Sequence, residues 1–282
     1  MAALQALSKP NKFLVNWNNP LTQGLVFTAP FFENAGSIHS LVHPLDTMTL
    51  TGNAVWDTAN GGKGLNGYSL VGSSTGAILT TPSSYIKPAN TVTIAWYGLL
   101  HDDGTGNIVN NPSIFGMANN NANSNPFVSY DIERRSNFNL DIRFAWNNAG
   151  TFHNLDISNG LSGQFKSPIM IVMTIDATNV IGYLNGVQVG ANGSGVTSIS
   201  YGATAALQVN RHITSTTDSA SSFALAGHIW NRVLTSTEVK SLYTNPWQIY
   251  VRPNYNPFYV PSPAVAGTAV KMQAIRGWSF PV

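Results

Sequence analysis

The stretch FALAGHIWNRVLTSTEVKSLYTNPWQIY, residues 223–250, decides the fold of this chain. Its first part alternates in polarity: Phe223, Leu225 and Ile229 point one way, and His228 and Trp230 point the other. This is the period of a β-strand that has one face in a core. We therefore expect a central strand of a β-sheet here.

The second part of the stretch predicts one short helix. Thr235 and Glu238 stand at the spacing of a capping box, in which each side chain satisfies a free backbone N–H of the other residue. Val239, Leu242 and Tyr243 then fall on one stripe of the helix. The Asn-Pro-Trp sequence that follows prevents its continuation.

The composition indicates one large β domain. The chain has 282 residues, of which 43% are hydrophobic and only 9% charged, with 25 glycines, and β-sandwiches of this size occur as single domains. The net charge of +2 and the lack of Lys or Arg runs exclude an extended phosphate-binding surface, so we expect no nucleic-acid partner. The absence of cysteine excludes disulfides and thiolate sites.

The N-terminal sequence MAALQALSKPNKFLVNWNNP lacks the features of a signal peptide, and no apolar run reaches the length of a membrane span. We therefore expect neither membrane insertion nor export by ordinary secretion.

Three segments give the clearest further signals. TVTIAWYGLL at 91–100 is a strand in which Trp96 lies in phase with the aliphatic residues, so a core position is favoured over a ligand platform. IMIVMTI at 169–175 is typical of a strand covered on both faces. Asn185 and Gly186 predict a tight hairpin turn.

Turn signals separate many other short strands. They are expected at 25–32, 48–50, 54–56, 65–71, 77–80, 114–117, 127–134, 138–146, 151–157, 180–184, 187–189 and 205–211. The segments 65–71 and 77–80 are expected to pair as a hairpin, as are 127–134 and 138–146. Many short strands with one helix predict an all-β protein made of two packed antiparallel sheets.

A family resemblance agrees with this fold. GHIWNRVL…NPWQIY in the deciding stretch, LTQGLVF at 21–27 and YLNGVQV at 183–189 resemble segments of concanavalin A-like, laminin G-type domains, in the subset found in bacteriophage and prophage structural proteins. The three segments bracket residues 21–250. The resemblance implies a jelly-roll sandwich.

The chain is therefore divided into three parts. We expect an N-terminal arm at 1–20, a laminin G-like sandwich at 21–250 and a Pro- and aromatic-rich arm at 251–282. The second arm would attach the protein to its neighbours through Tyr255, Phe258, Tyr259, Trp278 and Phe280.

The most polar strand pair gives the candidate site. A tight hairpin would place Asp131 opposite Asp141 and Ser129 opposite Arg143 on a solvent-exposed face. Repulsion between the two carboxylates requires a positive charge, and Arg143, diagonal to Asp131, is the favoured source. A calcium ion, a sugar site or catalysis are the alternatives.

Aromatic residues near this face could stack on a sugar ring. Tyr97, Tyr130 and Trp146 are the candidates, although the parity of Tyr130 favours a core role. The carbohydrate-binding candidates are accordingly Tyr97, Asp131, Arg143 and Trp146.

No catalytic set is evident. The glucanase branch of the fold uses a Glu-x-Asp-x-x-Glu strand, and the nearest string, Asp131-Ile132-Glu133-Arg134-Arg135, does not match it. We therefore expect no enzyme activity.

Metal and cofactor signals are weak. Laminin G-type domains can bind calcium at the sheet rim, where Asp102-Asp103-Gly104 would supply oxygens, with a solvated turn as the alternative. The six histidines, at 39, 43, 101, 153, 212 and 228, lack metal-ligand spacing.

The resemblance predicts a bacteriophage virion protein, a head decoration or tail-associated module exposed on the particle. Its partners would be other virion proteins and copies of itself. The alternative is a lectin-like module that binds host surface glycans; polysaccharide hydrolysis is a third hypothesis. Release inside a particle would fit the lack of a signal peptide.

Overall fold

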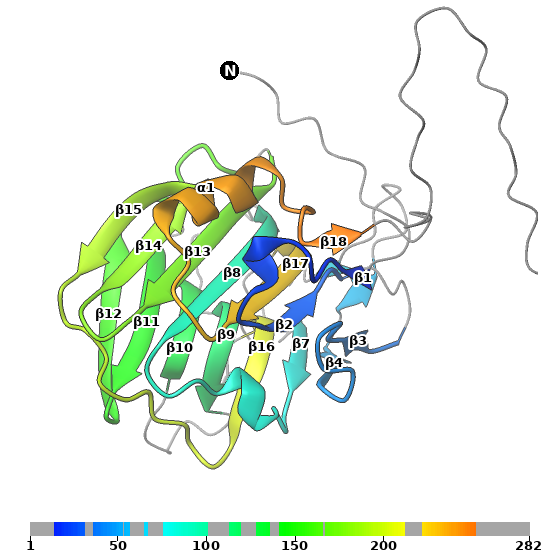
Figure 1. The fold of residues 1–282 in the computed structure, drawn as a ribbon, viewed down its shortest axis with the longest axis horizontal. Helices are drawn as coiled ribbons and strands as arrows, with labels where there is room; N and C mark the ends of the chain where they lie inside the picture. Colours follow the sequence, from blue (N-terminus) through cyan, green and yellow to red (C-terminus); the bar gives the residue numbers. More distant parts are fainter. Residues whose placement is uncertain are drawn as a thin grey trace, which may run out of the picture.

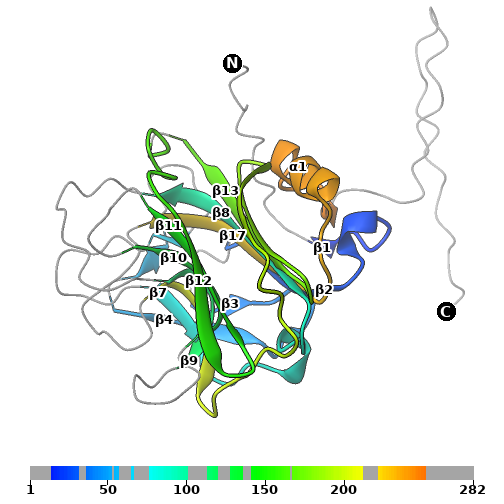
Figure 2. The same cartoon turned by 90° about the vertical axis from the view of Figure 1, so that its left-hand side faces the viewer.

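The structure is a computed structural model that describes residues 14–31, 36–52, 54–56, 65–66, 76–100, 113–119, 128–135, 141–165, 167–211 and 222–251. Within these residues, two eight-stranded antiparallel sheets pack face to face and one α-helix covers the outer face of one of them (Figures 1 and 2). The predicted all-β sandwich with one short helix is confirmed.

The sheet that carries the helix is called sheet I. Its strands are β2 (Leu25–Ala29), β5 (Val55–Trp56), β6 (Leu65–Asn66), β8 (Val92–Leu100), β13 (Ile169–Ile175), β14 (Val180–Leu184), β15 (Val187–Asn192) and β17 (Ser222–Trp230). They are ordered β15-β14-β13-β8-β17-β6-β5, and β2 also pairs with β17.

The opposite sheet is called sheet II. Its strands are β3 (Ile38–His39), β4 (Thr47–Thr51), β7 (Gly76–Leu79), β9 (Ser113–Asn119), β10 (Val128–Arg134), β11 (Ile142–Asn148), β12 (Thr151–Ile157) and β16 (Ala205–Arg211). Their order is β12-β11-β10-β9-β16-β7-β4-β3. The remaining elements are β1 (Leu14–Val15), β18 (Tyr250–Val251), the 3-10 turns η1 (Pro20–Thr22) and η2 (Ser84–Ile86), and α1 (Ser236–Thr244).

β17 is the central strand that the sequence predicts. It pairs with β8 on one side and with β2 and β6 on the other. In the first half of β17, the side chains do not point to the predicted faces of the sheet, because the register with β8 shifts between Ala224 and Ala226. This bulge reverses the alternation. As a result Ala224 and Ile229 lie in the core between the sheets, whereas Leu225 packs on the outer face of sheet I.

Large side chains fill the space between the sheets. Trp96, Phe115, Tyr130 and Trp146 come from four different strands, and all four are fully buried in this core. The Tyr130 hydroxyl donates a hydrogen bond to the Ile86 carbonyl oxygen at 2.6 Å. The core positions predicted for Trp96 and Tyr130 are confirmed.

A second apolar layer lies between sheet I and α1 (Figure 2). Val239 and Leu242 of the helix are buried against a cluster that includes Trp230. The helix starts at the predicted capping box: Thr235 Oγ1 accepts from the Glu238 N–H at 3.2 Å, and Glu238 Oε2 accepts from the Thr235 N–H at 2.8 Å.

The strong strand signals correspond to the structure. All residues of β13 are buried, as the sequence predicts. Asn185 and Gly186 have φ of 52° and 78°, which is the backbone of the predicted tight turn between β14 and β15.

The hairpin predicted between 65–71 and 77–80 is wrong. β6 pairs with β5 and β17 in sheet I, whereas β7 pairs with β4 and β16 in sheet II. Their adjacency in sequence suggested pairing, but each strand finds its partners elsewhere in the chain.

β1 and β18 form a two-stranded ribbon in which Leu14 pairs with Val251 and Val15 pairs with Tyr250 (Figure 1). The first and last described residues therefore lie side by side. Of the two predicted arms, residues 1–13 and 252–282 fall outside the described part of the chain, and these include Tyr255, Phe258, Tyr259, Trp278 and Phe280.

Candidate functional site

The predicted polar site lies on the outer face of sheet II. Asp131 and Glu133 extend from β10, and the Ser113 hydroxyl of β9 donates a hydrogen bond to Asp131 Oδ1 at 2.6 Å. The two carboxyl groups belong to residues that are only 1% and 3% exposed. The expectation of a wet hairpin face is therefore wrong. Alternating polarity along the strand marked a polar layer but could not show that the fold shields it from solvent.

The predicted register of this hairpin is also wrong. Asp131 pairs with Ala145, and Arg143 pairs with Glu133. Asp131 is therefore not opposite Asp141, nor Ser129 opposite Arg143. β11 begins at Ile142, four residues after the start predicted for the second strand of the hairpin, and Glu133 and Arg143 are Cα partners.

Arg143 is held mainly by Asp156 of β12. Its Nε and Nη2 donate to the two Asp156 carboxylate oxygens at 2.7 and 3.2 Å, while Glu133 Oε2 is 4.0 Å from Nη1. Arg135 lies 3.4 Å from Asp156. Arg143 therefore pairs mainly with Asp156, on the edge strand of sheet II. The favoured diagonal pairing with Asp131 does not appear among the described ion pairs.

Burial sets the protonation of the two inner carboxyl groups. It raises the pKa of Asp131 to about 8, although the hydrogen bond from Ser113 and one from the backbone of Ile132 act in the opposite direction. Burial, and then the charge of Asp131, raise the pKa of Glu133 well above its usual value. In the described part of the chain, Asp131 Oδ2 and Glu133 Oε2 have no hydrogen-bond partner. Asp131 therefore favours its protonated form near neutral pH, and the pKa of Glu133 is shifted in the same direction.

Asp156 behaves differently at the edge of the layer. Burial acts to raise its pKa, but the hydrogen bonds and charge of Arg143, with the charge of Arg135, lower the pKa overall. The pKa values of the two inner carboxyl groups are thus raised, whereas the pKa of Asp156, in the ion pair at the sheet edge, is lowered.

The four carbohydrate-binding candidates do not meet on one surface. Asp131 and Arg143 share the outer face of sheet II, whereas Trp146 is fully buried between the sheets and stacks on His153 with ring centroids 5.8 Å apart. Tyr97 lies on the outer face of sheet I, where its ring packs edge-on against Trp247. Trp146 has no exposed ring face for a sugar.

The calcium candidate Asp102-Asp103-Gly104 lies outside the described residues, as do His101 and His212. Within the described ranges, no group of three or more His, Cys, Asp or Glu side chains could hold a metal ion. His228 is fully buried beside Thr28, and burial lowers its pKa to about 3. No helix in the same ranges is long and apolar enough to cross a membrane.

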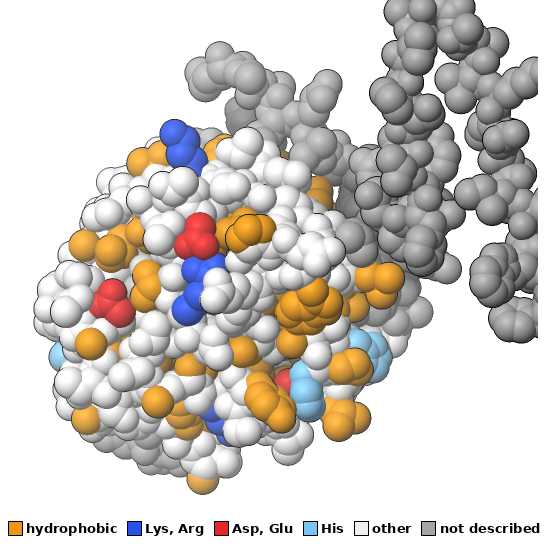
Figure 3. All heavy atoms as spheres, in the orientation of Figure 1, with side chains coloured by type: hydrophobic (Ala, Val, Ile, Leu, Met, Phe, Trp, Pro, Cys, Tyr) orange, Lys and Arg blue, Asp and Glu red, His pale blue; other side chains and the backbone are white. Residues whose placement is uncertain are grey.

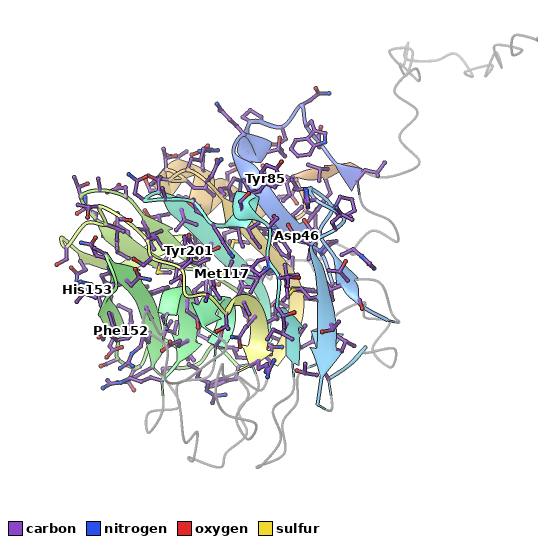
Figure 4. All side chains as sticks on the ribbon, turned by 90° about the horizontal axis from the view of Figure 1, so that it is seen from below. Asp46, Tyr85, Met117, Phe152, His153 and Tyr201 are labelled. Atoms are coloured by element: carbon purple, nitrogen blue, oxygen red, sulfur yellow. The ribbon has the colours of Figure 1, made fainter. Side chains whose placement is uncertain are left out.

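An exposed aromatic cluster, which the sequence did not reveal, lies beside η2. Tyr85 is 62% exposed and Leu45 86% exposed, and the rings of Tyr85 and His43 are 5.1 Å apart. We call Tyr85, His43 and Leu45 the Tyr85 patch. Hydrophobic and histidine side chains gather on the face of the molecule over β3 and β4 (Figure 3), and Tyr85 lies near Asp46 in the view from below (Figure 4).

Sequence reasoning missed this patch because its residues come from two loops distant in the chain. The Ser-Ser-Tyr-Ile string shows no periodicity, so the outward direction of Tyr85 and the burial of Ile86 could not be read from it. An aromatic residue between two prolines in a polar loop is the one local signal that was present.

Neither a protein-family model nor a curated protein matches this sequence. Several solved structures share its fold. The binding domain of Paraclostridial Mosquitocidal Protein 1 has a TM-score of 0.57 at 14% identity, over 81% of this chain and 53% of that chain. A botulinum neurotoxin type C structure, described by the dependence of cell entry on two ganglioside molecules, has a TM-score of 0.55 at 14% identity, over 79% and 51%.

Trypanosoma rangeli sialidase in complex with sialic acid has a TM-score of 0.55 at 15% identity, over 81% of this chain and 34% of that chain. The chain thus spans about half the length of the toxin structures and a third of the sialidase. At these identities the likeness shows the fold alone. This fold is a two-sheet β-sandwich, which the toxin structures and the sialidase also contain. The laminin G-type and bacteriophage assignment stays a prediction.

Proposed function

We propose that this chain is a non-catalytic, lectin-like binding module that recognises a glycan on a target surface. The observation that supports this most is its similarity, over about four-fifths of its length, to binding domains of toxins, one of them described with gangliosides. Because the chain spans only part of those structures, the glycan partner is part of the proposal.

The chemistry of sheet II supports binding over hydrolysis. A glycosidase needs two carboxyl groups that reach the substrate, about 5–5.5 Å apart in a retaining enzyme. Asp131 and Glu133 are the strongest candidates in the described residues, and both are shielded from solvent. Their raised pKa values follow from this burial and are accounted for without a catalytic role.

The experiment is a broad glycan array probed with the purified chain, followed by product analysis of every glycan that binds. We expect saturable binding to a subset of glycans and no cleavage. If cleavage occurs and the Asp131→Asn, Glu133→Gln variant abolishes it, the non-catalytic assignment is wrong.

A place on a bacteriophage particle is a second proposal, and it is compatible with glycan binding. It is motivated by the sequence resemblance at 21–27, 183–189 and in the deciding stretch. The β1–β18 ribbon also favours it, because both ends of the described chain lie together beside Leu14 and Trp17, each 60% exposed. Two arms that continue from one place could attach the sandwich to a neighbouring subunit.

Quantitative mass spectrometry of purified particles from the source phage or induced prophage tests this second proposal. We expect the chain at a fixed ratio to the major capsid protein, with a high ratio for a head decoration and a low one for a tail part. Its absence from purified particles would contradict a virion role and leave the glycan-binding proposal in place.

A further inference from the structure

We propose that the Tyr85 patch is the surface on which this module holds a pyranose ring of its glycan. The inference rests on the proposed function and names its site. The patch combines one exposed aromatic ring, one neighbouring imidazole and one exposed aliphatic side chain. His43 and Leu45 stand between β3 and β4, and β4 is separated from β10, which carries the buried carboxyl groups, by β9, β16 and β7.

The loop that carries His43 is braced by hydrogen bonds. The Ser40 N–H donates to the Asp46 carbonyl oxygen at 3.1 Å, and the Asp46 N–H donates to the His43 carbonyl oxygen at 2.9 Å. The Ser40 hydroxyl accepts from the His43 N–H at 3.3 Å. These bonds fix the loop in a closed turn, with Leu45 at its exposed tip.

Asp46 connects this loop to the turn that carries Tyr85. Its Oδ1 accepts from the Ser83 N–H at 3.0 Å and its Oδ2 accepts from the Ser83 hydroxyl at 2.8 Å. His43 Nδ1 is 3.5 Å from the same Oδ2. Asp46 is only 2% exposed, so we assign it a positioning role: it holds the two loops together and does not itself meet the ligand.

The turn η2 is also anchored to the core between the sheets. Ile86 is fully buried, and its carbonyl oxygen accepts the hydrogen bond from Tyr130 described above. The neighbouring Tyr85 is thereby directed outward on a rigid base. A side chain that is already ordered loses little conformational entropy when it binds, and tyrosine offers a large contact area for few rotatable bonds.

The chemistry of the patch fits a sugar ring. A pyranose presents a face of C–H groups, which packs on an aromatic ring, and a rim of hydroxyls, which pair with groups such as imidazole nitrogens and the tyrosine hydroxyl. The Tyr85 side chain is exposed and can meet a ligand. Binding sites for small ligands combine apolar area with a few polar groups in the same way.

The size of the patch argues against a protein as the occupant. A stable protein interface takes roughly 20–30 residues on each side. The Tyr85 patch consists of three side chains, and the residues that position them are largely buried.

The test compares four proteins on one broad glycan array: the wild type, Tyr85→Ala, Tyr85→Phe and Phe152→Ala. Phe152 is a matched control because it is also an exposed aromatic residue, 43% exposed, on β12 of the other part of the sandwich. The melting temperature of each variant confirms folding, and we expect little change because both side chains are exposed. The best wild-type ligand is then titrated with each protein.

We expect Tyr85→Ala to weaken binding about tenfold or more, equivalent to about 1.4 kcal/mol. Tyr85→Phe should retain most of the affinity because it keeps the ring, and Phe152→Ala should bind like the wild type. If the wild type binds a glycan and Tyr85→Ala binds it equally well, the site is elsewhere and only this inference fails. If the wild type binds no glycan on the array, the proposed function itself fails. Self-association of the wild type that Tyr85→Ala abolishes would identify a protein contact instead and overturn the inference.

Discussion

Asp131 is the residue whose chemistry the fold changes most. Its carboxyl group is buried on a sheet face, receives one hydrogen bond from Ser113 and has its pKa raised to about 8. The neutral acid is therefore the form that the folded protein favours near neutral pH. In the unfolded chain the same group loses its proton near its usual value of about 3.9.

This difference makes the stability depend on pH. Between the unfolded pKa and the raised folded pKa of Asp131, the folded state binds one more proton than the unfolded state. The protonated carboxyl group therefore stabilises the fold fully at low pH, and this stabilisation is lost as the pH rises to about 8. Asp131→Asn keeps the size and hydrogen-bonding capacity of the group without the titration. We compare the free energies of unfolding of the variant and the wild type at about pH 5 and about pH 9. We predict that this difference shifts in favour of the variant at the higher pH, by a few kcal/mol at most.

Urea denaturation of both proteins at the two pH values measures the effect. Asp176→Asn is the control of opposite sign: burial acts to raise the pKa of Asp176, but hydrogen bonds from Thr178 and Asn179 lower this pKa overall. The ionised Asp176 carboxylate stabilises the fold above its unfolded pKa, and this stabilisation is lost as the pH falls through the lowered folded pKa. Asp176→Asn should therefore lower the free energy of unfolding at neutral pH. An Asp131→Asn difference that does not change with pH would contradict the burial of a neutral acid.

At the scale of single elements, the terminal helix depends on its first turn. Thr235 and Glu238 form the capping box, and Arg232 Nη2 lies 2.7 Å from Glu238 Oε1 and adds charge-assisted support. The helix covers Trp230 and the other residues of the second apolar layer. Loosening its start should therefore expose part of that layer.

We predict that Thr235→Ala lowers the free energy of unfolding by about 1 kcal/mol. Ser236→Ala, at the neighbouring exposed position, removes a hydroxyl outside the capping box and serves as the matched control, with little expected effect. Chemical denaturation followed by tryptophan fluorescence measures both. Equal losses for the two variants would show that the box contributes no specific stability.

Elements with strong local signals were predictable, and those whose pairing depends on distant partners were not. β8, β13, the Asn185-Gly186 turn and α1 carry clear periodicity or capping residues. β6 and β7 carry strand signals, but they belong to different sheets, and each also pairs with a strand far along the chain, β17 or β16. No feature of the local sequence marks the bulge in β17, so the prediction of the sheet face to which Leu225 points is wrong.

The candidate site was less predictable than the fold, for a physical reason. Asp131 and Arg143 share a sheet face, as strand parity predicts. Their exposure depends on tertiary packing, and a buried polar layer has the same alternating pattern as a wet one. The Tyr85 patch depends on two loops held together by Asp46, and no sequence period reports such a contact.

At the scale of the whole molecule, the sandwich separates structural and surface roles. The core between the sheets and the layer under α1 provide the stability, while the exposed loop cluster at Tyr85 and the β1–β18 ribbon lie at its periphery. A rigid sandwich with functional groups on its loops is a common arrangement for recognition domains. Glycan recognition by the Tyr85 patch and attachment through the ribbon would use different parts of the surface and are compatible.

Glycan binding is tested by an equilibrium titration of the purified chain with the glycans of the broad array, presented as free sugars at concentrations up to the millimolar range. We predict saturable binding to at least one glycan, displaced by excess of the same free sugar and weakened by Tyr85→Ala but not by Phe152→Ala. A folded wild-type protein that binds none of them in this range would contradict the assignment of a lectin-like binding module.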